Sequence, residues 1–509
     1  MEKELTDEEN GAETVATAPV IPYSIFTSKQ KLLIITLVSI AATFSAFASN
    51  IYFPAIPAIA KDLSVTPELI NLTVTSYMIL QGLAPSIWGA AADVHGRRVT
   101  YICTFIVFIG ACVGLAETKH YYQLVILRCL QSAGSASTIA IGAGVVGDIT
   151  MRAERGGYMG IYQAGLLAPL SVGPILGGIF SQTLGWRAIF WFLTIYAGSF
   201  LVILVVVLPE TLRSMVGNGS LPAKGVSNSL MAYIQRRRHP QTEPPTLQRS
   251  VSVSSVGKKL SVDFLGPLKI IFSIEVTFLI IFLAIYYTVW QMTVAVMSTL
   301  FSTTYGLSEI HIGLTYIANG VACVAGTLTT GKFLDFEYKK FKKSFESNAE
   351  DFPLERARLR TLWLWAGIHI ASVLVFGWTL QNHVNIAVPI ICTFFLGWAS
   401  TSIIGIITTF MVDIFPKKGA SATAAVNFVR CLMGAGGTAS VLPTVNKVGV
   451  GWTFTLWAGV MLGALGLIVL QMERGPKWRR RGEKMNSSSQ PQQPTSIRQL
   501  LDDSQLNQI

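Results

Sequence analysis

The sequence predicts an all-α membrane protein in which twelve transmembrane helices form two pseudo-symmetric six-helix bundles. Only 13% of the 509 residues are charged and 51% are hydrophobic, whereas an ordinary soluble domain carries about 25% charged residues. The apolar residues also gather in long blocks, such as 32–51. Blocks of about twenty residues have the length needed to cross a hydrocarbon layer about 30 Å thick. A water-soluble protein could not expose such surfaces, so these blocks are predicted to be spans.

Hydropathy and loop polarity place the spans in order along the chain. The twelve predicted spans cover residues 32–54, 68–92, 99–117, 121–147, 157–181, 187–208, 274–300, 308–334, 361–380, 386–412, 419–443 and 452–472. A stretch rich in serine, proline and basic residues follows the sixth span and cannot bury a core. The predicted organisation is therefore an N-terminal tail (1–31), a first bundle (32–213), a linker (214–269), a second bundle (270–474) and a C-terminal tail (475–509).

The net charge of +11 raises the question of a nucleic-acid partner, and the placement of the basic residues answers it. If the N-terminus is cytoplasmic, the loops on that side carry most of the Arg and Lys, including the runs 236–238 and 339–343. The opposite loops have only Lys61, Lys119, Arg187 and Lys447. This asymmetry is the positive-inside pattern. It predicts a multi-pass membrane protein, in contact with lipid, with both termini in the cytoplasm and no nucleic-acid partner. We expect the membrane to be the plasma membrane, although the asymmetry does not identify it.

Other features exclude further classes of protein. All six cysteines lie inside apolar segments, so no disulfide framework is predicted. The acidic N-terminus shows no cleaved signal peptide. No metal-ligand cluster, nucleophile arrangement or phosphate-binding loop is apparent, which argues against an enzyme. We therefore expect a monomer that needs no metal or cofactor, and the sequence leaves proton coupling open.

A weak internal repeat supports the division into two halves. The stretch Gly89 to Asp93 after the second span recurs as Gly331 to Asp335 after the eighth, and Asp148 and Asp413 end the fourth and tenth spans. Parallel halves related by an axis along the membrane normal, with a site between them at mid-membrane, are a known plan of transporters. The repeat therefore favours a solute site between the bundles.

The short loop between the second and third spans resembles the signature loop of the major facilitator superfamily. Its small residues permit a tight turn, and its charged residues can pair with carboxylates, of which Asp148 is the obvious one. The family carries an arginine where Val94 stands here. The resemblance implies a latch for one of the alternating states, built from Gly89, Asp93, Gly96, Arg97, Arg98 and Asp148. A loop that merely obeys the positive-inside rule would explain the arginines but not the Gly and Asp spacing.

The fourth and fifth spans carry two more motifs. Arg128 lies too deep in the fourth span to be a loop charge, and an intramembrane arginine by default marks a cavity or pathway, although it can also snorkel or bind carbonyls for structural reasons. The fifth span carries Gly173, Pro174 and Gly177, which resemble the antiporter signature of the drug:proton antiporter branch. Glycines let helices approach closely and proline bends them, so this motif is predicted to act in gating, with tight packing as the simpler alternative.

Several other segments resemble fungal members of the superfamily. They are 49–54, 142–148, 351–360, and 421–427 with Arg430. Together they look most like the fungal citrate exporters and their multidrug-exporter relatives. The resemblance implies a secondary transporter that works by alternating access.

The residues predicted to bind the solute centre on two arginines, one from each half. Gln131 lies three residues after Arg128, and Asn427 three residues before Arg430, so each arginine shares a helix face with an amide. The spans offer almost no carboxylate away from their ends, so an anion could accept bidentate hydrogen bonds from both arginines. Polar or aromatic side chains that could complete the site, each with packing as its alternative role, are Asn50, Tyr52, Gln163, Tyr287, Trp290 and Asn319.

These residues favour a small organic anion as the solute. Together with the resemblance to fungal citrate exporters, they lead to the hypothesis that the chain exports a citrate-like di- or tricarboxylate. The first alternative is a broad-specificity drug:proton antiporter, because the motif of the fifth span belongs to that branch. The second is a nutrient receptor that keeps the fold and signals through its cytoplasmic segments, which the moderate length of the linker disfavours. A drug-susceptibility panel on a deletion strain would discriminate the anion exporter from the drug:proton antiporter.

Overall fold

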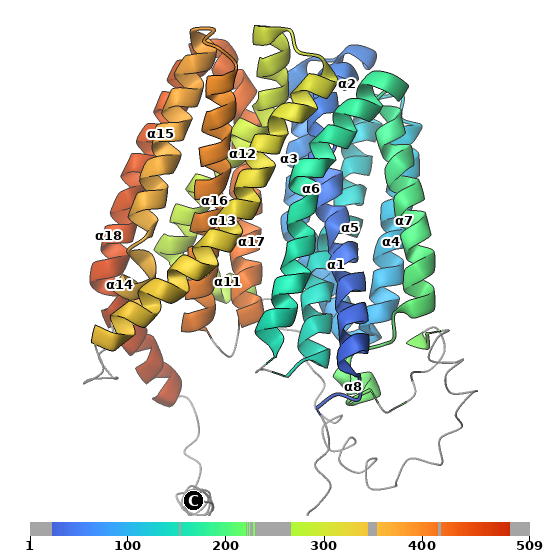
Figure 1. The fold of residues 1–509 in the computed structure, drawn as a ribbon, viewed down its shortest axis with the longest axis vertical. Coiled ribbons are helices and arrows are strands. Elements are labelled where there is room, and N and C mark those ends of the chain that lie inside the picture. The colour runs from blue at the N-terminus through green and yellow to red at the C-terminus, as the bar shows by residue number, and fades with distance from the viewer. Residues whose placement is uncertain are drawn as a thin grey trace, which may run out of the picture.

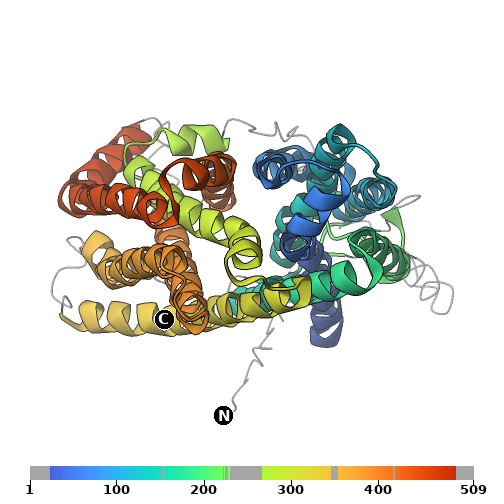
Figure 2. The ribbon, with the colours of Figure 1, turned by 90° about the horizontal axis from the view of Figure 1, so that it is seen from above.

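The computed structural model describes residues 23–151, 154–219, 221, 223, 227–229, 266–344, 354–415 and 419–488. The tails 1–22 and 489–509 and most of the predicted linker lie outside these ranges. The described residues form helices arranged in two bundles that stand side by side (Figure 1). Seen from above, the bundles form two separate groups of helices that approach each other (Figure 2).

The first bundle, coloured blue to green in Figure 1, contains the helices that precede the predicted linker. They are α1 (Ser28–Asn50), the 3-10 turn η1 (Phe53–Ala55), α2 (Ile56–Asp62), α3 (Pro67–His95), α4 (Arg97–Ala116), α5 (Tyr121–Ile149), α6 (Arg155–Leu184), α7 (Arg187–Val207) and α8 (Arg213–Val216). The predicted first span, 32–54, is broken near its end. Pro54 and Pro57 follow α1, and because proline cannot donate a backbone hydrogen bond, the chain passes through η1 before helix resumes.

The second bundle, coloured yellow-green to red, repeats this plan. It contains α11 (Gly266–Ile271), α12 (Thr277–Tyr305), α13 (Glu309–Ser344), α14 (Leu354–Leu359), α15 (Leu362–Gln381), α16 (Ala387–Ile414), α17 (Gly419–Val448) and α18 (Val450–Ser488). Twelve long helices therefore stand at the twelve predicted spans. Two run well past their predicted ends, α13 to Ser344 and α18 to Ser488, because a helix can continue into polar sequence that carries no hydropathy signal.

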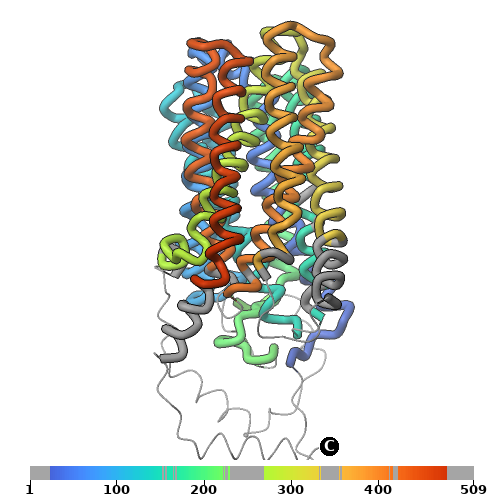
Figure 3. Tube along the Cα trace, turned by 90° about the vertical axis from the view of Figure 1, so that its left-hand side faces the viewer, coloured from blue at the N-terminus to red at the C-terminus, as the bar shows by residue number. Residues whose placement is uncertain are grey.

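Ten helical segments in the described ranges are long and apolar enough to cross a membrane. Their outward faces are apolar: Ile195 is 70% exposed and Val202 is 64% exposed on α7. Such surfaces are stable only against lipid. Inside the first bundle, aromatic rings fill the core, and the ring of Phe44 stacks on that of Tyr196 with centroids 4.3 Å apart. Both features agree with helices that cross the bilayer. Figure 3 shows that the long helices run roughly parallel to one another.

We call the end where α1 begins and α18 ends the inner end, and the opposite end the outer end. The surface along which the two halves meet, the seam, is formed mainly by α3 against α17 and by α6 against α13. At the outer end, Gln182 accepts a hydrogen bond from the backbone N–H of Ile310 at 3.0 Å, and Asn446 donates one to Glu68. The described hydrogen bonds across the seam thus begin at the outer end, and the innermost joins Asn427 to the carbonyl of Gln81 midway along α3.

Candidate functional site

In the first half, α5 places Arg128 at the centre of an aromatic cage. Its side chain is 1% exposed, and the guanidinium carbon lies 4.3 Å from the ring centroids of both Tyr52 and Tyr77. Its Nη1 donates to the carbonyl of Ala48 at 3.0 Å and to Oε1 of Gln131 at 2.6 Å. The cation therefore sits between two π faces, which attract a desolvated guanidinium.

Further hydrogen bonds hold the cage in place. The hydroxyl of Tyr52 lies 2.8 Å from that of Thr73, and the hydroxyl of Tyr77 lies 3.0 Å from that of Ser135. No aspartate or glutamate in the described ranges forms an ion pair with Arg128, whose Nε is buried and has no hydrogen-bond partner there. A buried cation without a carboxylate is costly, so this charge is balanced only by ring faces and neutral acceptors.

In the second half, α17 carries the corresponding arginine. Arg430 is partly exposed, and its Nε and Nη2 both donate to Oδ1 of Asn427, at 3.2 and 2.9 Å. Its guanidinium carbon lies 5.1 Å from the ring centroid of Tyr287 on α12. The two halves thus repeat one arrangement, an arginine fixed by an amide three residues away and by a tyrosine ring. Within the described ranges Arg430 also lacks an acidic ion-pair partner.

A second aromatic group lies beside Arg430. The ring of Trp290 packs edge-on against Tyr287 with centroids 5.8 Å apart, and its Nε1 donates to Oδ1 of Asn319 at 3.2 Å. A Cβ at Gly397 would collide with that same amide oxygen. Asn319 and Trp290 are both buried, so this hydrogen bond fixes the indole plane. Tyr287, Trp290, Asn319, Asn427 and Arg430 therefore form one connected group.

Met78 joins the two arginine groups. It follows Tyr77 on α3, and its sulfur lies 3.9 Å from Nε2 of Gln291 and 3.9 Å from Oγ1 of Thr438 in the other half. A Cβ at Gly434 would meet its methyl group at 2.6 Å. Consecutive residues of α3 thus face Arg128 on one side and the second half on the other. The sequence identifies neither Tyr77 nor Met78 as a site residue, because a tyrosine and a methionine in a span are typical of an ordinary core.

Two predicted site residues do not join these groups. The side chain of Asn50 donates to the carbonyl of Ala46 at 2.8 Å, within its own helix. Gln163 is exposed on α6, and none of the described contacts links its side chain to either arginine group. The structure therefore gathers eight of the ten predicted binding residues into two groups and leaves these two outside.

At the inner end, the predicted latch contains a three-residue ion-pair network. Arg97 contacts Asp93 at 2.7 Å through Nη1 and Asp148 at 3.0 Å through Nε. Gly96 has φ of 100°, a conformation that L residues with a Cβ rarely adopt. Gly89, by contrast, has room for a Cβ. The network joins the ends of α3 and α5 to the start of α4.

Arg98 is held against the end of α7, close to a carboxylate. Its guanidinium donates to the backbone carbonyls of Leu208 and Val205, which end α7. The carboxylate in this region is Glu210, which accepts the backbone N–H groups of Arg97 at 2.9 Å and Arg98 at 3.2 Å. An anion suits the N-terminus of α4, where the first N–H groups lack helical partners.

The second half has a comparable ion pair at its inner end. Arg358, just before α15, contacts Asp413 at 2.9 Å. Asp413 ends α16 as Asp148 ends α5, so the repeat found in the sequence extends to an ion pair in each half.

A further ion pair in the first half joins the loop after α5 to α1, where Nζ of Lys31 lies 2.5 Å from Glu154. The hydrogen bond from Lys31 lowers the pKa of the Glu154 carboxyl.

The glycines of α6 allow close packing at the outer half of the seam. A Cβ at Gly177 would collide with the carbonyl oxygen of Ile51, and one at Gly173 would lie 3.3 Å from Cβ of Asn50. On the neighbouring helix, a Cβ at Gly313 would lie 2.5 Å from the carbonyl oxygen of Pro174. The motif of the fifth span thus packs α6 against both the break in α1 and α13 of the other half.

The sequence of this chain is similar to the sequences of known proteins. Residues 38–438 match the model of the family described as Major Facilitator Superfamily. The chain is 40% identical over 478 residues to "Citrate exporter 1" of Aspergillus niger, which covers 91% of this chain and 89% of that protein. It is 34% identical over 464 residues to "MFS antiporter QDR2" of Candida albicans, covering 89% of each.

Two solved structures share the fold at 15% identity. A D-xylose-proton symporter superposes with a TM-score of 0.62 over 86% of this chain and 97% of its own. The human organic anion transporter MFSD10 (TETRAN) gives a TM-score of 0.54 over 87% of this chain and 100% of its own. These similarities concern the arrangement of the helices, which is the one predicted from the sequence.

Proposed function

The chain belongs to the major facilitator superfamily, and from that premise we propose that it exports a small organic anion, of the citrate-like di- or tricarboxylate class, by alternating access. The relative from Aspergillus niger is named as a citrate exporter, which supports this class of substrate. Each half supplies one arginine, and the solute binds between the halves near mid-membrane. No nucleic-acid partner is involved, and the chain works as a monomer.

One observation carries the proposal. Arg128 and Arg430 lie within the helix bundle, and neither forms an ion pair with a carboxylate among the described residues. Both guanidinium groups are instead oriented by an amide oxygen and a ring face. A carboxylate ligand would gain charge-assisted hydrogen bonds in a medium of low dielectric. A cationic drug would be repelled there.

The two arginines differ in solvent exposure, so we assign them different roles. Arg430 is partly exposed and, with Asn427, contacts the anion directly. Arg128 is covered by Tyr52 and Tyr77, so its charge attracts the anion from behind these rings in the state described here. Because the described hydrogen bonds across the seam run from its outer end to its middle, we assign this state as the one that loads solute from the inner end.

The direction of transport follows from the membrane potential. The basic loops predict that both termini are cytoplasmic, and we place the protein in the plasma membrane, so that the inner end faces a negative interior. Each negative charge that moves outward then gains about 2.3 kcal/mol per 100 mV. A di- or trianion is therefore driven out without ATP.

The test is efflux of radiolabelled citrate from cells that express the chain, within a panel of mono-, di- and tricarboxylates and cationic drugs. Arg430→Ala should abolish efflux of the preferred acid, while Arg430→Lys keeps part of it because the charge remains. Arg474→Ala is the matched control, since Arg474 is exposed near the inner end of α18. Unchanged efflux in Arg128→Ala and Arg430→Ala together would refute the assigned site.

A broad drug:proton antiporter is the second candidate. The antiporter-like glycines of α6 and the 34% identity to the antiporter from Candida albicans favour it. A drug-susceptibility panel on cells with and without the chain discriminates the two. Resistance to several cationic drugs without organic-acid efflux would select the antiporter.

A further inference from the structure

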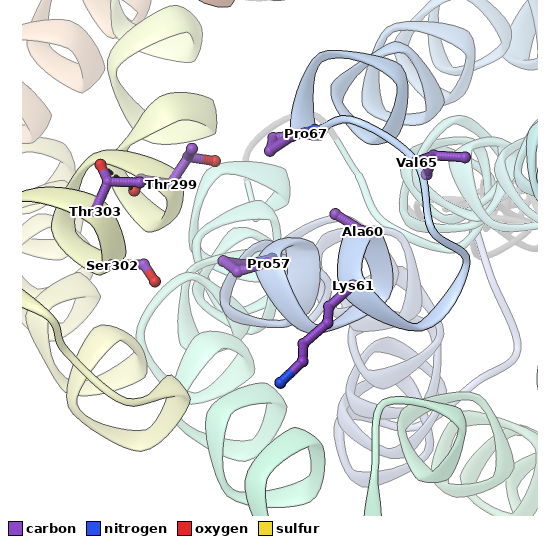
Figure 4. A pocket seen from close by; sticks show the side chains of 8 residues that line it. All are labelled: Pro57, Ala60, Lys61, Val65, Pro67, Thr299, Ser302 and Thr303. Carbon is purple, nitrogen blue, oxygen red and sulfur yellow. Dashed lines mark hydrogen bonds between the residues drawn. The ribbon is translucent and has the colours of Figure 1, made fainter.

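A groove opens at the outer end of the seam, far from both arginines along the helices. Its volume is about 270 Å³, and both halves line it (Figure 4). The first half contributes Pro57 and Lys61 from α2, and the second contributes Thr299, Ser302 and Thr303 from α12. The groove thus lies between α2 of the first half and α12 of the second.

The groove offers one unneutralised cation. Lys61 is exposed, and no hydrogen bond or ion pair of its ammonium group is found among the described residues. Its neighbour Asp62 is already engaged, because it accepts from Arg187 at 2.8 Å and from Trp186 at 3.1 Å. The nearby carboxylate Glu68 is likewise held by Asn446. Lys61 is therefore free to attract an anion from the outer side.

The opposite wall offers hydroxyl donors. The Oγ1 atom of Thr299 is buried and has no hydrogen-bond partner within the described ranges, although a buried hydroxyl is normally satisfied. Ser302 lies about one helical turn further along the same wall, and Figure 4 shows its hydroxyl together with the extended side chain of Lys61. The hydroxyl of Thr303 already donates to the backbone carbonyl of Thr299 at 3.0 Å, so Thr299 and Ser302 supply the donors of this wall. An ammonium group on one side and hydroxyls on the other are the donors that a carboxylate accepts from.

We propose that this groove binds a carboxylate that arrives from the outer side, and that the exported acid itself is the ligand. Because the two walls belong to different halves, a ligand that bridges them binds only the state closed at the outer end and shifts the equilibrium toward it. Accumulated external acid then slows its own export. The identity of the acid rests on the proposed function, whereas the site itself does not.

The first experiment measures efflux of labelled citrate into media with increasing unlabelled citrate at constant ionic strength and pH. Efflux by the unchanged protein should fall as external citrate rises. Lys61→Gln should keep the efflux measured without external citrate, but half-inhibition should need about fivefold more citrate, the size expected for one partly exposed ion pair. Lys61→Arg should restore the inhibition. Thr299→Val should weaken it in the same direction as Lys61→Gln.

The matched control is Lys119→Gln, which removes an exposed lysine from the loop between α4 and α5 at the same end, outside the groove. It should leave inhibition unchanged. Equal inhibition of Lys61→Gln and the unchanged protein would overturn the proposal. So would external citrate that accelerates efflux in both, since that is the behaviour of exchange at a single central site.

A second experiment separates failure of this site from failure of the proposed function. Purified Arg430→Ala protein, in which the central site is disabled, is heated with citrate and with sodium chloride at equal ionic strength. Citrate should raise its melting temperature, and the rise should vanish in the double variant Arg430→Ala/Lys61→Gln. This readout does not require transport, so it reports on the groove even if citrate is not exported. A rise that persists in the double variant would refute the groove as the site.

Discussion

The rings of Phe53 and Tyr316 stack in parallel across the seam, with centroids 6.0 Å apart and an interplanar angle of 6°. Phe53 lies in η1 of the first half and Tyr316 on α13 of the second, and both are 1% exposed. Phe53 directly follows Tyr52, whose ring covers Arg128. Two adjacent residues after α1 therefore link the halves: Tyr52 covers the buried Arg128 of the first half, and Phe53 stacks on the second half.

Removal of this stack should loosen the outer end of the seam. An aromatic pair contributes about 0.5–1.5 kcal/mol beyond its buried area, which corresponds to roughly two- to tenfold in a conformational equilibrium. Tyr316→Ala should increase the rate at which a membrane-impermeant maleimide labels a cysteine placed by Ser302→Cys. Tyr316→Phe keeps the ring and loses the hydroxyl that donates to the carbonyl of Val294, so it should label like the parent. Equal rates in all three proteins would show that the stack does not hold the seam.

The cage around Arg128 should require a planar cation. Lysine keeps the charge but cannot stack flat between Tyr52 and Tyr77, and it cannot donate to Ala48 and Gln131 in the same geometry. We expect Arg128→Lys to reduce efflux of the preferred anion by roughly tenfold or more, on the scale of a desolvated cation–π contact of about 2 kcal/mol. Efflux is measured at equal amounts of protein in the membrane. Full activity of Arg128→Lys would mean that only the charge matters.

Asn427 is a second test of the anion site. Because its Oδ1 accepts two hydrogen bonds from Arg430, Asn427→Asp would place a carboxylate where only a neutral acceptor stands. That carboxylate would neutralise Arg430 internally, so the protein should fold and reach the membrane but lose anion efflux. Asn427→Ala should weaken apparent affinity by about tenfold, since Arg430 loses its orienting partner. Normal efflux in Asn427→Asp would contradict direct anion binding by Arg430.

Gly177 tests the packing role of the α6 motif. A Cβ there would collide with the backbone carbonyl oxygen of Ile51, which no rotamer change can relieve, whereas Gly160 has nothing within 4 Å. Gly177→Ala should therefore lower the melting temperature in detergent, and Gly160→Ala should leave it unchanged or raise it slightly, because alanine is worth about 0.5–1 kcal/mol in a helix. Equal stability of the two variants would show that α1 and α6 separate easily.

Glu210 should stabilise the inner end of the first half. Its carboxylate accepts the backbone N–H groups of Arg97, Arg98, Thr211 and Leu212, at 2.9 to 3.2 Å. Glu210→Gln keeps the size but removes the negative charge from the start of α4, with an expected loss of about 1–2 kcal/mol. Thermal unfolding of the purified variant measures this loss. A control is Glu473→Gln, since Glu473 is exposed on α18, and it should unfold like the parent.

The helices could be predicted from the sequence because lipid imposes length and apolarity on each span. The pairing of Arg97 with Asp148 was equally accessible, since both lie at neighbouring span ends. Other contacts depend on the order in which helices pack. Nothing in the sequence distinguishes Tyr77, which faces Arg128, from a tyrosine of the core. Nothing in it predicts that the guanidinium of Arg98 would donate to the backbone carbonyls of Leu208 and Val205. The side chain of Asn50 donates to a carbonyl of its own helix, because an acceptor nearby in the chain competes with more distant ones.

The polar residues of α3 have a consequence for synthesis of the chain. Asn71 donates to the carbonyl of Thr438 on α17, a partner 367 residues later in the sequence. At about 5–20 residues per second, α3 therefore waits roughly 20–70 s in the membrane before α17 is made. During that interval its amide has no partner from the second half, and α3 must be held by its neighbour α5 in the first. We expect the newly made first half to depend on that contact until α17 is inserted.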